Sequence, residues 1–199
     1  LMLRNAAPAL RDAAIVSRLR QAGVVILGKT NMTEFAFTAI GDNQHYDTPG
    51  NAIDASRIPG GSSSGAGASV CEGTSEISIG SDTGGSVRIP AAFCGAWGYR
   101  PTTGRWPTAG IVPISTTRDT PGPITLSATD MVLLDSVVTS SSPVVASTIK
   151  GTRLGIPHKH FWDLADAEVA AICMEALQRL VAEGAELVEV DPQALLKPY

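Results

Sequence analysis

Glycine and proline are concentrated in the middle of this chain, and this concentration limits the folds that it can adopt. Most of the 20 glycines and 13 prolines lie between residues 49 and 123, where serine and threonine are also frequent. Such a composition can form a flexible linker. Valine, isoleucine, alanine and phenylalanine are interleaved with the polar residues, however, so we interpret the segment as a series of tight turns around a site.

Outside this segment, the spacing of apolar residues predicts helices that alternate with buried strands. Asp12 and Asp166 are expected to cap the first and last helices, and Gly23 and Gly184 to end them. The segment 66–70 holds only small residues, which suits a helix packed against a close neighbour. The other predicted helices span 13–22, 32–37, 128–138 and 167–183, and the predicted strands span 24–27, 77–79, 153–156 and 187–190. This alternation predicts an α/β fold with a mixed sheet covered by helices on both faces.

The composition argues against several classes of partner. The formal net charge is −4 and basic residues form no cluster, so we expect no nucleic-acid partner. The three cysteines lack CxxC spacing and the three histidines lack an HExxH arrangement, so we expect neither a disulfide framework nor a metal site. No apolar run reaches about 18 residues, so no membrane span is expected. We interpret the cysteines as reduced packing residues of a cytoplasmic protein.

The run Gly84-Gly85-Ser86 has the residue types of a turn that presents a nucleophile. Two glycines allow backbone conformations that side chains forbid, and they remove steric bulk. The successive N–H groups of Thr83, Gly84, Gly85 and Ser86 could then point at one spot, as an oxyanion hole or an anion nest. Ser86, at the end of the turn, would be placed to attack a carbonyl carbon. The alternative is a glycine-rich turn without chemistry.

A serine hydroxyl is a weak nucleophile and needs a base. A second glycine–serine loop offers Ser62, Ser63 and Ser64, and Ser62 lies 24 residues before Ser86. A serine can relay a proton but cannot be the base. An uncharged lysine could serve, as in Ser-Lys variants of the serine-hydrolase plan, if it is desolvated or set near other cations. Ser62 could also be an ordinary turn serine that bonds its own backbone.

Two stretches resemble the signature of the amidase-signature family. They are 60–65, Gly-Gly-Ser-Ser-Ser-Gly, and 80–92, Gly-Ser-Asp-Thr-Gly-Gly-Ser-Val-Arg-Ile-Pro-Ala-Ala. The segments 28–35 and 118–123 also look like parts of this family, while the last 50 residues match more loosely. The resemblance implies the family's α/β fold, in which a mixed sheet is covered by helices on both faces, here present only in part.

The resemblance also implies a role for each matching residue. Ser86 is the nucleophile that forms an acyl-enzyme, and Ser62 is the triad serine that follows a cis peptide bond. The N–H groups of Thr83, Gly84, Gly85 and Ser86 form the oxyanion hole. Asp82 and Arg88 form an ion pair that supports the turn. No cofactor or metal is implied.

The catalytic lysine of the family has no counterpart here. It lies well before the Gly-Lys-Thr-Asn segment, after a strand, and none of the four lysines at 29, 150, 159 and 197 has that context. Lys29 is the tempting substitute, but its family context is structural. We therefore expect residues 1–199 to be the central part of a single amidase-signature domain, without the lysine segment and the C-terminal part.

The expected function is hydrolysis of a carboxylic amide to an acid and ammonia. The segments 104–113 and 118–120 resemble the branch of indoleacetamide and mandelamide hydrolases, which implies a primary amide of aryl-acetic type. The alternatives are a subunit similar to the amidase of glutamyl-tRNA amidotransferase, and a catalytically incomplete fragment or pseudoenzyme. A phosphate-binding module is disfavoured because GxxxxGK[ST] is absent. The expected partner is a small-molecule amide, and a homo-oligomer is possible.

Overall fold

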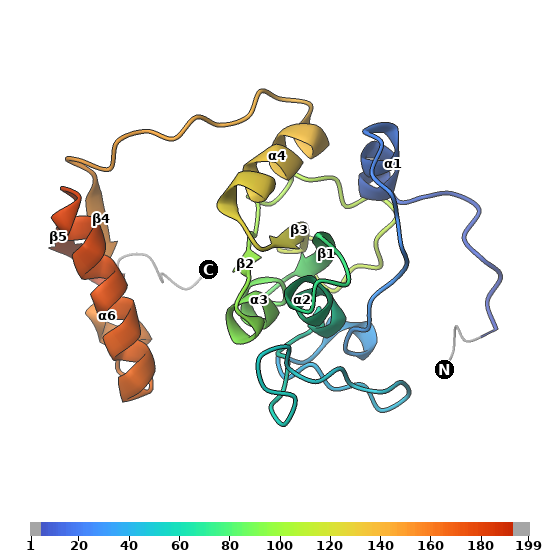
Figure 1. Ribbon diagram of the computed structural model, residues 1–199, viewed down its shortest axis with the longest axis horizontal. Coiled ribbons are helices and arrows are strands. Elements are labelled where there is room, and N and C mark those ends of the chain that lie inside the picture. Colours follow the sequence, from blue (N-terminus) through green and yellow to red (C-terminus); the bar gives the residue numbers. More distant parts are fainter. Residues whose placement is uncertain (1–4, 193–199) are drawn as a thin grey trace. The chain divides into compact units, whose positions relative to one another are not determined.

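The computed structural model describes residues 5–192, which belong to two compact units (Figure 1). Unit 1 is Leu1–Val144 and unit 2 is Val145–Tyr199, so the described parts are residues 5–144 and 145–192. Both glycine–serine loops belong to unit 1. The candidate site is therefore built from unit 1.

A three-stranded antiparallel sheet organises unit 1. Its strands are β1 (Ile77–Asp82), β2 (Trp97–Gly98) and β3 (Thr120–Thr125), in the order β1-β3-β2. The register pairs Ile77 with Thr125 at one end of β1 and Asp82 with Thr120 at the other. All six residues of the central strand β3 are buried, as expected for a strand covered on both faces. The register places the end of β1, where the turn that carries Ser86 begins, beside the start of β3.

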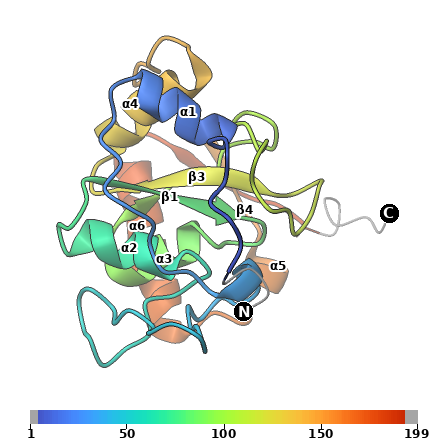
Figure 2. The same ribbon diagram turned by 90° about the vertical axis from the view of Figure 1, so that its right-hand side faces the viewer.

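Helices cover both faces of this sheet, as predicted. Unit 1 contains α1 (Ala14–Gln21), the 3₁₀ turn η1 (Glu34–Ala36), α2 (Ser64–Cys71), α3 (Arg88–Cys94) and α4 (Ala128–Thr139). Figure 2 shows α1 and α4 on one side of β1 and β3, and α2 and α3 on the other. The first pair of helices encloses a core of Ile15, Leu19, Trp106, Leu134 and Val138, and the second encloses a core of Ala66, Val70, Val87, Ala91 and Ile124.

The small residues of α2 allow two close backbone approaches, which confirms the sequence prediction. A Cβ atom at Gly67 would lie 2.9 Å from the carbonyl oxygen of Pro90 on α3. At Gly65 it would lie 2.5 Å from the backbone nitrogen of Asn31. Real side chains do not tolerate such distances, because packed interiors have no room to adjust. These contacts place the first half of α2 against Asn31 and against α3.

A buried carboxylate connects α4 to the loop after β2. Asp135 accepts hydrogen bonds from the Trp106 indole N–H at 3.0 Å and from Arg105 Nε at 2.9 Å, and Arg105 Nη2 forms an ion pair with its other oxygen. The hydrogen bonds from Arg105 lower the pKa of Asp135 below its ordinary value, although burial opposes them. Asp135 therefore stabilises the folded state in its ionised form.

The stability of unit 1 should accordingly depend on pH through Asp135. Because its folded pKa lies below the unfolded value of about 4, its contribution is complete above that value and is lost as the pH falls through the folded pKa. We expect Asp135→Asn to cost about 1–3 kcal/mol near neutral pH, and we expect the difference from wild type to shrink on acidification. Urea unfolding at a series of pH values measures it, with Asp12→Asn as the surface control. A difference that stays constant down to pH 3 would contradict this role.

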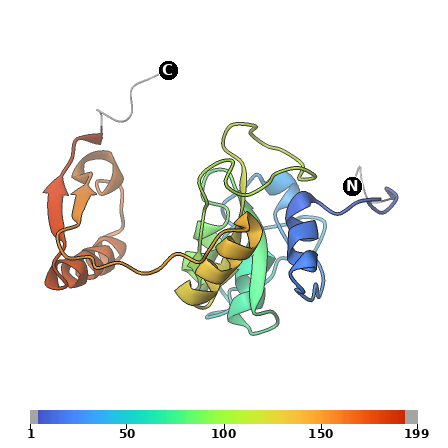
Figure 3. The same ribbon diagram turned by 90° about the horizontal axis from the view of Figure 1, so that it is seen from above.

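Unit 2 is a short βαβ unit. β4 (Arg153–Ile156) and β5 (Glu186–Glu189) pair in parallel, and α5 (His158–Phe161) and α6 (Ala167–Ala182) lie between them in sequence. Figure 3 shows the two strands side by side, with α6 beside them. Asp166 caps α6 by accepting the Glu168 N–H at 2.9 Å, and Gly184 follows α6 with a φ of +100°, both as predicted. The apolar stripe of α6 is largely exposed within this unit, for example at Val169 and Ile172.

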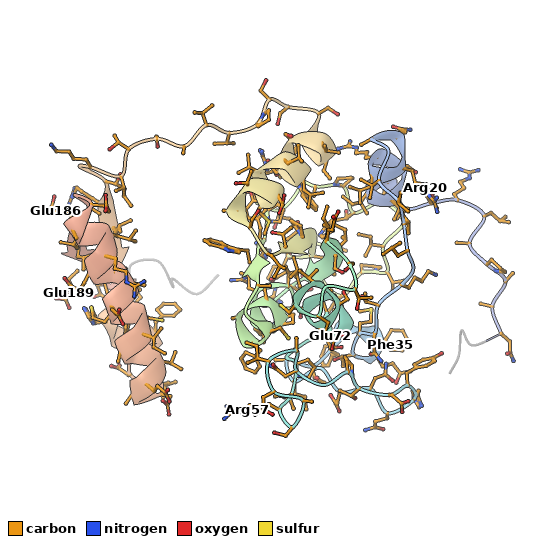
Figure 4. All side chains as sticks on the ribbon, in the orientation of Figure 1. Arg20, Phe35, Arg57, Glu72, Glu186 and Glu189 are labelled. Carbon is orange, nitrogen blue, oxygen red and sulfur yellow. The ribbon has the colours of Figure 1, made fainter. Side chains whose placement is uncertain are left out.

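Three local predictions for the N-terminal segment are wrong. The apolar run 24–27 is not a strand: it is irregular and Leu27 is 73% exposed. A strand needs a hydrogen-bonded neighbour, and no strand within residues 5–192 pairs with this run. The expected helix 32–37 is a single 3₁₀ turn, because Phe35 (labelled in Figure 4) and Ala36 adopt positive φ. Asp12 does not cap α1 but pairs with Arg20 at 2.9 Å.

The cysteines differ in their surroundings. Cys71, Cys94 and Cys173 are all free thiols. Cys94 is buried on α3, and burial raises the pKa of its thiol, so it is a packing residue as predicted. Cys173 is exposed on α6, where the packing interpretation is wrong. No helix in the described part of the chain combines the length and the apolar character needed to cross a membrane.

Candidate active site

The turn between β1 and α3 carries Ser86. β1 ends at Asp82 and α3 begins at Arg88, so the whole turn has only five residues. Gly85 has a φ of +128°, in the region that favours glycine, and a Cβ atom there would lie 2.8 Å from Ile89 Cδ1. The glycine predicted to free the backbone is thus favoured by the conformation of the turn. Ser86 is half-buried at the end of this turn.

Asp82 holds the turn from below. Its side chain is fully buried, and Oδ1 accepts the Gly85 N–H at 2.8 Å while Oδ2 accepts the Val87 N–H at 3.2 Å. Arg88 donates from Nε and Nη2 to the two oxygens, each at 3.0 Å. Arg100 Nε lies 3.3 Å from Oδ1 as a second ion-pair partner. The predicted Asp82–Arg88 pair is present, and Arg100 is a further partner that the sequence did not indicate.

These contacts keep Asp82 ionised. Burial alone would raise the pKa of Asp82, but the hydrogen bonds from Arg88 and from the N–H groups of Gly85 and Val87 outweigh it and lower the pKa below its ordinary value. The same interaction raises the pKa of the Arg88 guanidinium. The turn is therefore built around a permanent negative charge near neutral pH.

One of the four predicted oxyanion donors has a different acceptor. The Gly85 N–H is donated to Asp82, so it stabilises the turn and does not point towards a substrate oxygen. This narrows the predicted oxyanion hole to the N–H groups of Thr83, Gly84 and Ser86. Sequence patterns could not separate Gly85 from its neighbours, because the direction of each N–H depends on the conformation of the turn.

The second glycine–serine loop lies directly against this turn. The N–H of Ser63 donates to the carbonyl oxygen of Ser86 at 3.2 Å, which brings the two predicted serines, Ser62 and Ser86, onto adjoining backbone segments. The Gly61–Ser62 peptide bond is cis, as the resemblance implies. The Thr33 N–H donates to the carbonyl oxygen of Ser62 at 2.9 Å, so this segment is held on its other side as well.

The hydroxyl of Ser62 is buried without a hydrogen-bond partner. Ser62 is 0% exposed, and no atom in the described part of the chain bonds its Oγ. Asn31 Oδ1 and Thr33 Oγ1 share this condition, and both belong to the segment beside Ser62. A buried polar atom left unsatisfied costs free energy, so its presence requires an explanation such as a functional role.

Ser63 and Ser64, the other two serines of this loop, have hydrogen-bond contacts to the backbone. Ser63 Oγ accepts the Ser81 N–H of β1 at 3.2 Å, and Ser64 Oγ lies 3.5 Å from the Asn31 carbonyl oxygen. Both hydroxyls thus have backbone contacts, whereas that of Ser62 has none within the described residues. Lys29 and Lys150 are both exposed, whereas a neutral lysine base requires a desolvated setting. The side chain of Lys159 and the whole of Lys197 lie outside the described residues.

A second carboxylate contacts the turn from the side of β3. Thr83 Oγ1 donates to Asp119 Oδ1 at 2.5 Å. Asp119 also lines an open cavity of about 430 Å³, together with Ser81 and Thr120 at the adjoining strand ends and with the loop 103–116. Within residues 5–192, no group of three or more His, Cys, Asp or Glu side chains is arranged to hold a metal ion.

Comparison with known proteins agrees with the resemblance in the sequence. A family model described as "Amidase" matches residues 2–197. An indoleacetamide hydrolase of Pseudomonas savastanoi is 46% identical over 91% of this chain and 40% of its own length, and a mandelamide hydrolase of Pseudomonas putida is 45% identical over 90% and 36%. A solved amidase structure superposes with a TM-score of 0.87 at 36% identity, over 94% of this chain and 43% of that one. The chain thus spans about 40% of the length of the curated relatives it matches.

Proposed function

The chain belongs to the amidase family, and from this premise we propose that the protein containing it hydrolyses a carboxylic amide through a serine acyl-enzyme. Ser86 is the proposed nucleophile and Ser62 the proposed proton relay. One observation carries this assignment: the Ser63 N–H···O=C Ser86 hydrogen bond joins the backbone beside Ser62 to the turn that presents Ser86, and the buried hydroxyl of Ser62 has no partner within residues 5–192. A buried hydroxyl without a partner costs free energy, and a function in proton transfer would account for its presence here.

In the proposed mechanism, Ser86 Oγ attacks the amide carbonyl carbon while its proton passes to Ser62 Oγ and on to a base. The developing oxyanion is stabilised by the N–H groups of Thr83, Gly84 and Ser86, held in place by Asp82. The leaving nitrogen takes up a proton by the reverse path and departs as ammonia. Water then hydrolyses the acyl-enzyme by the same relay, which regenerates Ser86.

The proposed base is a neutral lysine that approaches Ser62 from another part of the same domain. Lys29 and Lys150 are exposed, whereas a neutral lysine base requires a desolvated setting. Since this chain spans about 40% of its curated relatives, we propose that residues 1–199 form the central part of a single domain. The lysine would then come from a segment outside them.

The proposed substrate is a primary amide on an aryl-acetic type of acyl group. Two relatives at about 45% identity are named for indoleacetamide and mandelamide, both of which are amides of this kind. We propose a small-molecule amide as the partner and hydrolysis to the acid and ammonia as the net reaction. The chemistry balances with water as the only co-reactant.

Labelling with a fluorophosphonate tests the assignment, because such a probe traps an activated serine. In the full-length protein that contains this chain, we expect one adduct, located at Ser86 by mass mapping. The 199-residue chain alone should react slowly and should release no measurable ammonia from indoleacetamide, since the base is missing. An adduct at another serine would overturn the role of Ser86. Rapid ammonia release by the chain alone, abolished by Ser86→Ala, would overturn the proposal of an external base.

A further inference from the structure

The nucleophile turn has a second anchor besides Asp82. Thr83, the first residue of the turn, donates its hydroxyl to Asp119 Oδ1 at 2.5 Å. The two residues are 36 positions apart, so this bond joins the turn to the segment that leads into β3. A hydrogen bond to an ionised acceptor is short and about twice as strong as a neutral one, so it can fix the orientation of a short loop.

Asp119 is itself held rigidly. Its Oδ2 accepts the N–H groups of Ile114 at 2.7 Å and Ser115 at 2.9 Å, and its own N–H donates to the Ser115 carbonyl oxygen at 3.0 Å. Burial favours the neutral acid, but the hydrogen bonds from Thr83, Ser115 and Ile114 outweigh it and lower the pKa of Asp119. Both oxygens of Asp119 accept hydrogen bonds, so its position is fixed and it can hold the Thr83 side chain in one orientation.

Asp119 also lines the open cavity described above. The cavity wall includes Asp119, Ser115 and Thr116, and also Ser81 on β1. Asp119 therefore joins a cavity wall to the residue that begins the nucleophile turn. A shift of the 114–119 loop has a direct path to Thr83 through one hydrogen bond.

We propose that Asp119 is a positioning residue: through Thr83 it sets the geometry of the oxyanion turn and couples that turn to the loop that walls the cavity. This inference rests on the proposed function of Ser86. Thr83 contributes a proposed oxyanion N–H, so loss of its side-chain anchor would displace a donor at the point where charge develops. Displacements of about 1 Å in such sites cost on the order of 100-fold in rate.

Steady-state kinetics of the full-length protein with a primary aryl-acetamide tests the coupling. Thr83→Val removes the hydroxyl with little change in shape, and Asp119→Asn removes the charge. Each should lower kcat by roughly 10- to 100-fold, with a much smaller change in KM, because the interaction acts on the transition state. Thr83→Ser, which keeps a hydroxyl, should lose much less than Thr83→Val. The matched control is Thr117→Val, an exposed hydroxyl in the same loop, which should leave kcat unchanged.

The double variant separates positioning from independent effects. If the two side chains act through one bond, Thr83→Val with Asp119→Asn should be about as slow as the slower single variant. A kcat of Thr83→Val equal to that of wild type, a Thr83→Ser as slow as Thr83→Val, or a double loss equal to the product of the single losses would overturn the proposal. Thr83→Val decides the question even if Asp119→Asn fails to fold.

Failure of the inference can be distinguished from failure of the proposed function. Ser86→Ala is measured in the same assay: if it retains activity, the serine mechanism is wrong, and the inference falls with it. If Ser86→Ala is inactive and Thr83→Val matches wild type, only the positioning role of Asp119 is overturned. An inactive Ser86→Ala together with a slow Thr83→Val supports both.

Discussion

Ser86→Ala in the full-length protein is expected to lower kcat for amide hydrolysis by about 10⁴-fold or more, because the acyl-enzyme can no longer form. The remaining rate would come from substrate binding and the turn N–H groups alone. Substrate affinity should persist, since Ser86 is half-buried and its hydroxyl is required for chemistry more than for binding. Ammonia release from indoleacetamide measures kcat, and a binding titration with the same amide measures affinity.

The control for this experiment is Ser64→Ala. Ser64 is a buried serine at the start of α2, and its hydroxyl makes only a 3.5 Å contact with the Asn31 carbonyl oxygen. We expect this variant to keep nearly all activity. If Ser86→Ala and Ser64→Ala were equally active, the nucleophile would have to be sought elsewhere.

The second large effect concerns stability. Asp82→Ala should lower the free energy of unfolding by about 3–5 kcal/mol, because it leaves Arg88 and Arg100 without their shared buried partner and leaves the Gly85 and Val87 N–H groups without an acceptor. Reactivity of Ser86 towards a fluorophosphonate should fall as well, since the turn loses its support. Urea unfolding at neutral pH measures the first effect and labelling rate the second.

A surface pair provides the comparison for Asp82. Asp12→Ala removes one partner of the Asp12–Arg20 ion pair, in which both side chains are well exposed. Exposed pairs contribute about 0–1 kcal/mol, so this variant should unfold close to wild type. Similar unfolding midpoints for Asp82→Ala and Asp12→Ala would show that the buried carboxylate is not an anchor.

The motifs of the site could be predicted from sequence because their information is local. Gly84 and Gly85 predict a turn, and Ser86, which follows them, lies where that turn ends. The partners that stabilise the turn could not be predicted in this way. Arg100 and Asp119 reach it only because the register of β1, β2 and β3 brings distant segments together, and no local spacing encodes that register.

The central strand β3 was missed for a different reason. Pro121 and Pro123 argue against a strand between two neighbours, because proline lacks the N–H that a ladder requires. The structure accommodates both by placing them on alternate residues. The Tyr99 N–H donates to the Pro123 carbonyl oxygen at 3.1 Å, so the proline nitrogens face the side of β2, which is only two residues long. On the side of the longer partner, β1, lie Thr120, Gly122 and Ile124, which have backbone N–H groups.

Residues 24–27 show the opposite error, since a strand was predicted there and the structure is irregular. Four successive apolar residues satisfy the composition of a buried strand, but composition does not supply a neighbour. Secondary structure that depends on pairing is therefore the least predictable part of this chain. Helices such as α4 and α6, whose backbone bonds are internal, were predicted within one or two residues of their bounds.

The depth of Asp82 also decides how the turn responds to its ionic surroundings. Dissolved ions weaken attraction between charges that water can reach, with a screening length of about 8 Å at physiological strength, but they act far less on charges enclosed by protein. Asp82 has no exposed surface, whereas Asp12 and Arg20 are open to solvent. A high salt concentration that breaks the exposed Asp12–Arg20 ion pair should therefore leave the contacts of Asp82 with the Ser86 turn intact.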